Sequence, residues 1–296
     1  MAPPVKHSRR PKGFSAALRR AFIDACTLEL RALKPGNVHD YAAGHGMSVG
    51  DFIASAEAAA APLCRAGRGV GVRIRDAAAA THAAVGCNTN LGIVLLAAPL
   101  LAAAERATGG DLRQALRERL AALSVADAVA AYEGIRIASP AGLGHAESQD
   151  VSAAPEVTLR EAMALAAGRD RIARQYAADY EDVFAIGVAG LAVARRQGLS
   201  PEWAASRIYM AFLAAFPDSH VARKYGAAIA EDVRAEAAPL AARLLAADAP
   251  ERLVPDLLAF DAALKARGIN PGTSADLTVA SMLAEALEAL LRGAAV

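Results

Sequence analysis

Polar residues with the chemistry of an active site gather in five short segments of this chain, which is otherwise rich in alanine and leucine. The segments supply carboxylates, amides, hydroxyls and cations, the groups that transfer protons and bind phosphates or metal ions. They are residues 34–40, 86–92, 142–150, 218–226 and 270–276. Each is predicted to lie at a helix end or in a loop, and such a concentration is unusual for a helical bundle with a purely structural role.

The first two segments flank predicted helix ends. A helix is expected to stop at Lys34, because the Pro-Gly pair that follows cannot continue it and favours a tight turn. An ordinary C-cap with a favourably placed lysine explains the same residues. Residues 86–92 precede the most apolar helix, whose first-turn N–H groups form a natural site for a phosphate or carboxylate. Simple capping of that helix by Asn88 or Thr89 is the alternative.

The third and fourth segments combine acids, bases and hydroxyls. Residues 142–150 contain two glycines, a histidine, a glutamate, a serine and an aspartate, in what is predicted to be a loop; a solvated surface loop is the alternative. If residues 218–226 are helical, Ser219, Arg223 and Gly226 share one face. An ordinary charged helix start would explain this segment equally well.

The fifth segment, residues 270–276, opens the last predicted helix. Thr273 and Asp276 have the spacing of a capping box, so Asp276 is most simply an acid that caps this helix at position N3. The alternative is that the preceding Pro-Gly pair leaves the helix N-terminus free to face a phosphate.

Helical periodicity extends over almost the whole chain, and no run alternates apolar and polar residues for long enough to indicate a strand. We therefore predict an all-α fold, a single compact domain of about eleven helices over residues 13–296, preceded by a disordered basic tail, residues 1–12. Residues 48–51 and 124–127 resemble capping boxes at two of the helix starts. The predicted helices are residues 13–34, 51–65, 74–85, 89–107, 111–123, 125–138, 159–198 (as two helices), 201–216, 220–246, 250–267 and 274–292.

The charge balance and the apolar runs limit the function classes. Lys and Arg number 32 and Asp and Glu 31, for a net charge of +1, so no general attraction to nucleic acid is expected. The most apolar run, residues 91–104, is shorter than the roughly 20 residues that cross a bilayer. Three scattered cysteines and a start without an apolar leader predict a cytoplasmic protein with reduced thiols and no membrane partner. A homo-oligomer is compatible with the sequence.

Four of the five segments follow the order of motifs in a known enzyme family. Residues 34–40 contain Lys-Pro-Gly-x-Val followed by Asp, and residues 86–92 contain Gly-x-Asn-Thr and end in Gly. Residues 218–226 begin with Asp and lead to a basic residue and Gly, and residues 271–277 read Pro-Gly-Thr-Ser-Ala-Asp-Leu. With these motifs the chain resembles the triphosphoribosyl-dephospho-CoA synthase family. Members of that family transfer the triphosphoribosyl group of ATP to dephospho-CoA with release of adenine, which makes a prosthetic-group precursor.

The resemblance implies a pentosyl transfer at the ribose carbon that bears adenine, through a transition state with positive charge on the sugar. A carboxylate must stabilise that charge or take the proton of the acceptor. The implied catalytic residues are Asp40, Asp218 and Asp276. Binding of ATP is assigned to Lys34, Asn88, Thr89, Arg223, Lys224, Gly272 and Ser274. Mg²⁺, which usually bridges phosphates to one or two carboxylates, is assigned to Asp40, Glu147, Asp150 and Asp218.

One departure from the family pattern bears on the second substrate. The chain has Asn90-Leu91 where the family commonly has His-Lys. Loss of this basic pair predicts a divergent branch, whose acceptor is dephospho-CoA or a related alcohol or phosphorylated compound. The expected partners are therefore small molecules, ATP and this acceptor.

Two other functions remain open on the residues alone. The dipeptide His39-Asp40 suggests a metal-dependent phosphohydrolase of the HD type, but that chemistry needs a further upstream histidine, and His7 in the basic tail is the only one. A non-catalytic nucleotide-binding helical protein would need a broad apolar or charged face for a partner, and no predicted helix has one. The glycine-spaced residues 65–75 lack the preceding strand of a dinucleotide fingerprint, although they could help to hold phosphates.

Overall fold

The computed structural model describes residues 13–40, 48–107, 110–139 and 149–293. Within these ranges the chain is helical throughout and contains no strand. The helices are α1 (Phe14–Arg31), α2 (Val49–Leu63), α3 (Val70–Val85), α4 (Leu91–Ala104), α5 (Leu112–Ala121), α6 (Val125–Ala138), α7 (Leu159–Ala166), α8 (Arg171–Ala177), a π-helical segment η1 (Val183–Val188), α9 (Ala189–Arg196), α10 (Pro201–Ala215), α11 (Ser219–Tyr225), α12 (Ala227–Ala246), a 3₁₀ segment η2 (Pro250–Leu253), α13 (Val254–Ala266) and α14 (Gly272–Leu291). The predicted all-α single domain is confirmed; the predicted tail, residues 1–12, lies outside the described ranges.

The prediction of about eleven helices is too low, because two long predicted helices are interrupted. Residues 159–198 form α7, α8, η1 and α9, and the chain turns after α8 through Asp179 and Tyr180, whose φ angles of 50° and 61° are left-handed. Gly226, with a φ of 95°, separates α11 from α12. Left-handed residues cannot continue an α-helix, and apolar periodicity alone does not reveal such breaks.

Helix starts follow the predicted capping chemistry, with one exception. Both predicted capping boxes are present, at the starts of α2 and α6. The exception is Asp276. Helix α14 begins at Gly272, and its N-cap residue Pro271 makes no side-chain capping bond. Asp276 is therefore the fifth helical residue, and the capping interpretation is wrong.

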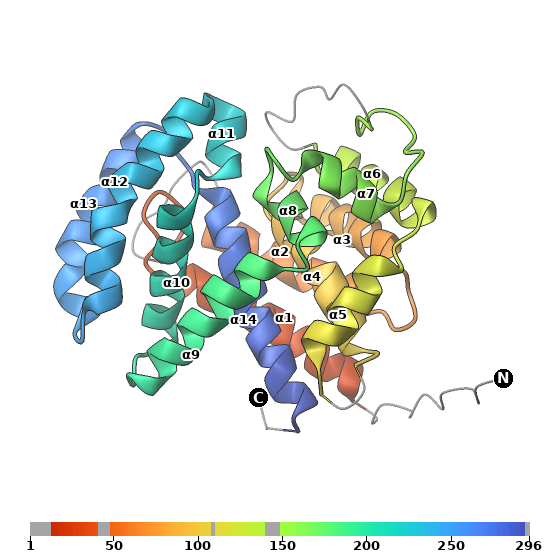
Figure 1. Ribbon diagram of the computed structural model, residues 1–296, viewed down its shortest axis with the longest axis horizontal. Coiled ribbons are helices and arrows are strands. Elements are labelled where there is room, and N and C mark those ends of the chain that lie inside the picture. Colours follow the sequence, from red (N-terminus) through yellow and green to blue (C-terminus); the bar gives the residue numbers. More distant parts are fainter. Residues whose placement is uncertain (1–12, 41–47, 108–109, 140–148, 294–296) are drawn as a thin grey trace.

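The core is organised by α4 and α14. Every residue of α4 except Gly92 is buried, and the hydroxyls of Tyr176 and Tyr180 donate to the carbonyls of Leu95 and Leu96 at 2.6 and 3.0 Å. Figure 1 shows α14 between α9 and α10 on one side and α4 and α5 on the other, with α12 and α13 at the outer edge. No helix among the described residues is long and apolar enough to cross a membrane. The start of α14 is therefore surrounded by several other elements, and most of the polar segments meet there.

Candidate active site

The loop before α14 is held by the loop that follows α1. The side-chain amide of Asn37 donates to Asn270 Oδ1 at 2.8 Å, and the N–H of Gly36 donates to Asp261 Oδ1 at 2.8 Å. Gly36 has a φ of 81°, and a Cβ at this position would lie 2.9 Å from the ring of Pro271. Only glycine tolerates both the left-handed conformation and this close approach. The first and fifth polar segments, 235 residues apart, are thus one structural unit.

Asp218 joins the starts of α11 and α14. Its Oδ1 accepts from the N–H groups of His220 and Val221 at 2.9 and 3.2 Å, and its Oδ2 accepts from the N–H and hydroxyl of Ser274, both at 2.8 Å. The carboxylate is fully buried, and burial raises its pKa although the four donors oppose the shift. Asp218 therefore caps two helices at once, and no oxygen is left facing solvent.

Asp276 lies one turn further along α14, against the first turn of α4. A Cβ built on Gly92 would lie 2.0 Å from Asp276 Oδ2, so the carboxylate occupies the space of a missing side chain. Within the described part of the chain, neither oxygen of Asp276 has a hydrogen-bond donor. Its side chain is partly exposed, yet burial among neighbouring atoms raises its pKa well above the ordinary value. The charges of Asp218 and Glu29 raise the pKa further and that of Arg223 lowers it.

Arg223 brings a cation to this group. Its Nη1 lies 3.4 Å from Asp170 Oδ2, and its Nη2 lies 3.3 Å from His220 Nδ1. Gly272, at the start of α14, packs against the ring of His220 at a distance that would just admit a Cβ, 3.4 Å. Lys224, in contrast, is exposed, and its Nζ lies 5.2 Å from the ring centre of Tyr225. Of the two predicted phosphate ligands on α11, Arg223 is the one whose charge acts on Asp276.

Lys34 is fully buried beneath this site. Its ammonium group donates to Glu29, to Asn37 Oδ1 at 3.0 Å and to the carbonyl of Val38 at 2.7 Å. These three bonds use all three donors of the side chain. Burial lowers the pKa of Lys34 and raises that of Glu29, while their mutual attraction opposes both shifts. Lys34 thus stabilises the loop after α1, and in this structure none of its donors is directed at a ligand.

The predicted nucleotide ligands of the second segment hold the start of helix α4. Asn88 Oδ1 accepts from the N–H of Leu91 at 3.1 Å, and Thr89 Oγ1 donates to Ser55 Oγ at 2.6 Å. The bond of Asn88 agrees with the capping interpretation, whereas Thr89 connects the segment to α2. They also fix the start of α4, on which the contact between Gly92 and Asp276 depends.

The predicted magnesium ligands do not form a cluster. Asp150 accepts from the N–H and hydroxyl of Ser152 at 2.9 and 2.6 Å, the oxygens of Asp218 are occupied, and Glu147 lies outside the described residues. Asp40 is exposed. No group of three or more His, Cys, Asp or Glu side chains in the described ranges could hold a metal ion.

The dipeptide His39-Asp40 does not have the arrangement of an HD metal site. His39 is buried with Nε2 at 3.3 Å from Asp261 Oδ1, whereas the neighbouring Asp40 is exposed. A shared metal requires imidazole and carboxylate to converge on one point, and these side chains occupy different environments.

Sequence analysis missed two parts of the site. Asp170 caps α8 and contacts Arg223, and the N–H of Arg171 donates to Ser219 Oγ at 2.8 Å. The spacing of Asp170 before an apolar-periodic helix is an N-cap signal that could have been recognised. Glu29, an acid within α1, gave no such signal, because only folding buries it and brings it near Asp276.

The glycine-spaced residues 65–75 have a packing role. A Cβ on Gly71 would lie 2.2 Å from the carbonyl oxygen of Asp127, and the N–H of Gly71 donates to Asp127 Oδ1 at 2.9 Å. The small residues therefore allow the connection between α2 and α3 to contact the start of α6.

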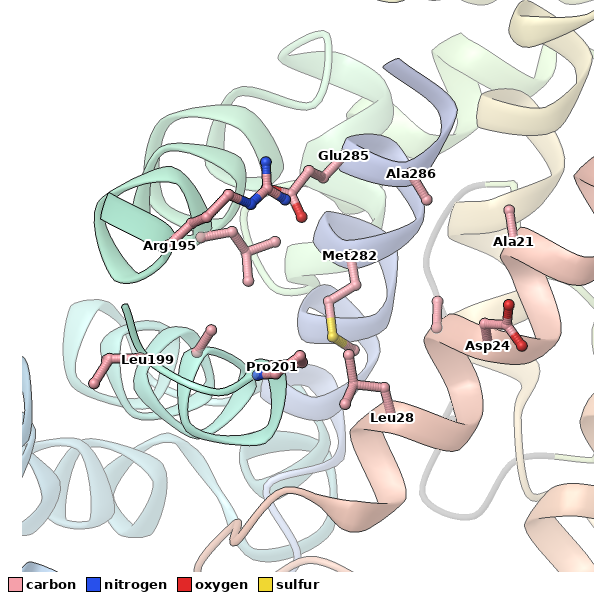
Figure 2. A pocket seen from close by; sticks show the side chains of 12 residues that line it. Ala21, Asp24, Leu28, Arg195, Leu199, Pro201, Met282, Glu285 and Ala286 are labelled. Atoms are coloured by element: carbon pink, nitrogen blue, oxygen red, sulfur yellow. The ribbon is translucent and has the colours of Figure 1, made fainter. Parts of the chain in front are cut away.

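A cavity that is larger than a single side chain lies elsewhere on α14. It measures about 290 Å³ and is bounded by α1, α9, α10 and α14, with Met282 and Glu285 at its wall (Figure 2). Its lining is mainly apolar, apart from Asp24 and the ion pair of Arg195 with Glu285 at 2.7 Å. None of the predicted site residues lines it, so we do not assign it to the site at the start of α14.

Comparison with known proteins identifies the family. The family of ATP:dephospho-CoA triphosphoribosyl transferases matches residues 15–294. In structure, the chain is similar to a candidate triphosphoribosyl-dephospho-CoA synthase from Archaeoglobus fulgidus, with a TM-score of 0.62 and 23% sequence identity over 80% of this chain and 99% of that chain. At that identity the likeness concerns the fold. No protein of curated function matches the chain in sequence. Because the family match covers nearly the whole chain, this protein belongs to the ATP:dephospho-CoA triphosphoribosyl transferase family.

Proposed function

We propose that Asp276 is the catalytic carboxylate of a triphosphoribosyl transfer from ATP to dephospho-CoA or a closely related acceptor. One observation carries the proposal: Asp276 is partly exposed, has no hydrogen-bond donor among the described residues and lies against a helix N-terminus. Perturbed carboxylates in such surroundings are typical of active sites. The family supplies the reaction class, and the geometry supplies the residue.

The proposed step is a substitution at the ribose carbon that bears adenine. The bond from this carbon to the adenine nitrogen breaks, and adenine leaves with the bonding electrons and takes a proton from solvent, to which Asp276 later returns the proton that it accepts. An acceptor hydroxyl forms the new carbon–oxygen bond and gives its proton to Asp276. The ionised carboxylate also stabilises the positive charge that develops on the sugar between these events, as carboxylates do in glycoside hydrolysis. Its raised pKa makes it a stronger proton acceptor than an ordinary aspartate.

The triphosphate is proposed to bind between Arg223 and the first turns of α4 and α14. These two helices have 14 and 20 residues, and their N-terminal N–H groups carry partial positive charge. Arg223 adds a full charge near enough to act on Asp276. Lys34 and Lys224 are not included, because one is enclosed and the other is directed to solvent.

Asp218, Ser274 and Gly272 are assigned to positioning rather than chemistry. The four bonds of Asp218 tie α11 to α14, so they set the distance between Arg223 and Asp276. Mg²⁺ would arrive with ATP, since it is commonly held by phosphate oxygens and one or two carboxylates. Asp276 is the carboxylate of this group with oxygens available for it.

The experiment that tests the proposal is incubation of the purified protein with ATP, Mg²⁺ and dephospho-CoA, with adenine and ADP separated by chromatography. Release of free adenine that depends on the acceptor is the expected result. Formation of ADP without adenine would assign the protein to kinases or ATPases instead. A parallel series with CoA and other phosphorylated alcohols identifies the preferred acceptor. The series is needed because the chain has Asn90-Leu91 in place of the His-Lys pair.

A further inference from the structure

A small pocket lies beside the start of α4, where Gly92 contacts Asp276. Its free space is about 10 Å³, enough for one water-sized group. Helices α1, α2 and α4 supply its lining, which consists of Cys26, Glu29, Leu30, Phe52, Ala56, Asn90 and Ile93. The wall is therefore mostly apolar and carries two strongly polar groups, Glu29 and Asn90.

Asn90 contributes a hydrogen-bond donor without a partner. Its side chain is buried, with 6% of its surface exposed, and its Nδ2 has no acceptor in the described part of the chain. Asn90 precedes α4 but makes no capping bond to it. An amide donor buried without an acceptor is costly, so native proteins seldom keep one without a ligand, a water or another role. A ligand that brings an acceptor atom into this pocket would satisfy the donor.

Glu29 contributes the matching acceptor. Its Oε1 is bonded to Lys34, and its Oε2 has no hydrogen bond within the described ranges. The hydrogen bond from the buried Lys34 holds this carboxylate in place. The pocket thus presents one donor and one acceptor to a group that enters it, between apolar side chains of α1, α2 and α4.

The pocket is close to the proposed reacting carbon. Gly92, which contacts Asp276, follows Asn90 by two residues. The charges of Glu29 and Asp276 both raise the pKa of the Cys26 thiol, which also lines the pocket, although burial of the thiol is the larger cause. The pocket is therefore near enough to Asp276 for the base of a substrate whose ribose carbon lies at Asp276 to reach it.

We propose that the pocket recognises the edge of adenine in ATP, and that Asn90 is a specificity-determining residue. This inference rests on the proposed function. The exocyclic amino group of adenine fits the water-sized space and donates to Glu29, while the adjacent ring nitrogen accepts from Asn90 Nδ2. An asparagine amide is a common partner of this edge. Guanine has an oxygen in place of the amino group, and that oxygen would face the carboxylate of Glu29.

Two substrate comparisons test the inference without changing the protein. Wild-type kcat/KM is measured with ATP, GTP and N6,N6-dimethyl-ATP, with release of the free base as the readout. Sites built to hydrogen-bond a substrate group discriminate strongly against analogues that lack it, so we expect a preference for ATP on the order of 100-fold or more over both. Equal use of ATP and GTP overturns the inference.

The variant Asn90→Leu tests the residue itself. It removes the unpartnered donor at similar volume, so its melting temperature should equal or exceed that of the wild type. We expect the affinity for free adenine, measured by calorimetry, and kcat/KM for ATP to fall on the order of ten-fold, with the value for GTP unchanged. The control is Ser206→Ala, which removes a different buried polar group without a partner, a hydroxyl on α10 away from the pocket. It should change neither the affinity for adenine nor kcat/KM for ATP.

The outcomes separate this inference from the proposed function. If Asn90→Leu releases adenine with unchanged discrimination and unchanged adenine affinity, the pocket does not read the base, while the transfer reaction stands. If the wild type releases no adenine with any acceptor, the proposed function fails. Adenine binding that still weakens in Asn90→Leu would then support the pocket by itself.

Discussion

The carboxylate of Asp276 fills the position that a side chain would take on Gly92. A Cβ there would lie 2.0 Å from Oδ2 and 2.5 Å from the carboxyl carbon of Asp276, distances that non-bonded atoms do not adopt. The glycine is not needed for a left-handed turn, because it is the second residue of a regular helix. Its role is to let an acid from α14 reach the N-terminus of α4.

Replacement of Gly92 by alanine is expected to displace Asp276. Overpacking of this kind typically costs about 1–3 kcal/mol, so the melting temperature should fall. Adenine release should fall on the order of ten-fold or more, because a small displacement of a catalytic group has a large effect on rate. The control is Gly168→Ala, where an added Cβ meets no atom within 4 Å. Wild-type turnover by Gly92→Ala would show that the position of Asp276 does not matter to the chemistry.

Asp276→Asn should lower turnover on the order of 100-fold or more while the protein remains folded. Asparagine keeps the shape of the side chain but cannot accept the acceptor proton or offer a negative charge to the sugar. The measurements are adenine release and a thermal melt on the same preparation. Turnover within a few-fold of the wild type would leave Asp276 without a catalytic role.

The stability of Asp276→Asn should depend on pH in a defined direction. Because the folded-state pKa of Asp276 is raised, the native protein binds more protons than the unfolded chain between the ordinary aspartate pKa and the raised value. This carboxylate therefore lowers wild-type stability as pH rises through that interval and has no effect below it. The variant should melt with the wild type near about pH 4 and above it at neutral pH. A variant that melts lower at every pH would indicate a structural role for the carboxylate.

Arg223→Met should change both the binding of ATP and the pH profile. Without the charge that favours its ionised form, Asp276 should have a still higher pKa, so the acidic limb of kcat/KM moves to higher pH. KM for ATP should rise on the order of ten-fold through loss of a phosphate contact. The matched control is Arg234→Met on α12, a surface arginine paired with Glu231, which should leave the profile unchanged. An unshifted acidic limb in Arg223→Met would show that the charge of Arg223 does not act on the catalytic carboxylate of Asp276.

Asp218→Ala should destabilise the protein by about 2–4 kcal/mol, since it removes the caps of two helices and each cap contributes about 1–2 kcal/mol. Asp218→Asn retains acceptor oxygen and should lose less. If Asp218 acts only through positioning, residual adenine release should follow the folded fraction and the pH profile should stay that of Asp276. A fully folded Asp218→Asn with turnover reduced as far as in Asp276→Asn would instead place Asp218 in the chemistry.

Local patterns along the chain were enough to predict the fold class, the family and the polar segments. Periodicity and capping boxes at residues 48–51 and 124–127 depend on contacts within a few residues, so they can be recognised locally. The order of four motifs predicted the family, which the match over residues 15–294 confirms. Breaks within residues 159–198 were missed, because left-handed residues such as Tyr180 leave no mark on apolar spacing.

Only the tertiary structure separated the three predicted catalytic aspartates. Asp40 is exposed, Asp218 has both oxygens bonded, and Asp276 alone of the three faces a helix start without a donor among the described residues. Lys34 changed role for a related reason: its partners are local, but only the packed fold buries the side chain and leaves its donors enclosed. The availability of a charged group depends on which distant donors surround it. That property arises from packing between segments up to 235 residues apart, such as residues 36 and 271, and is not contained in any local pattern.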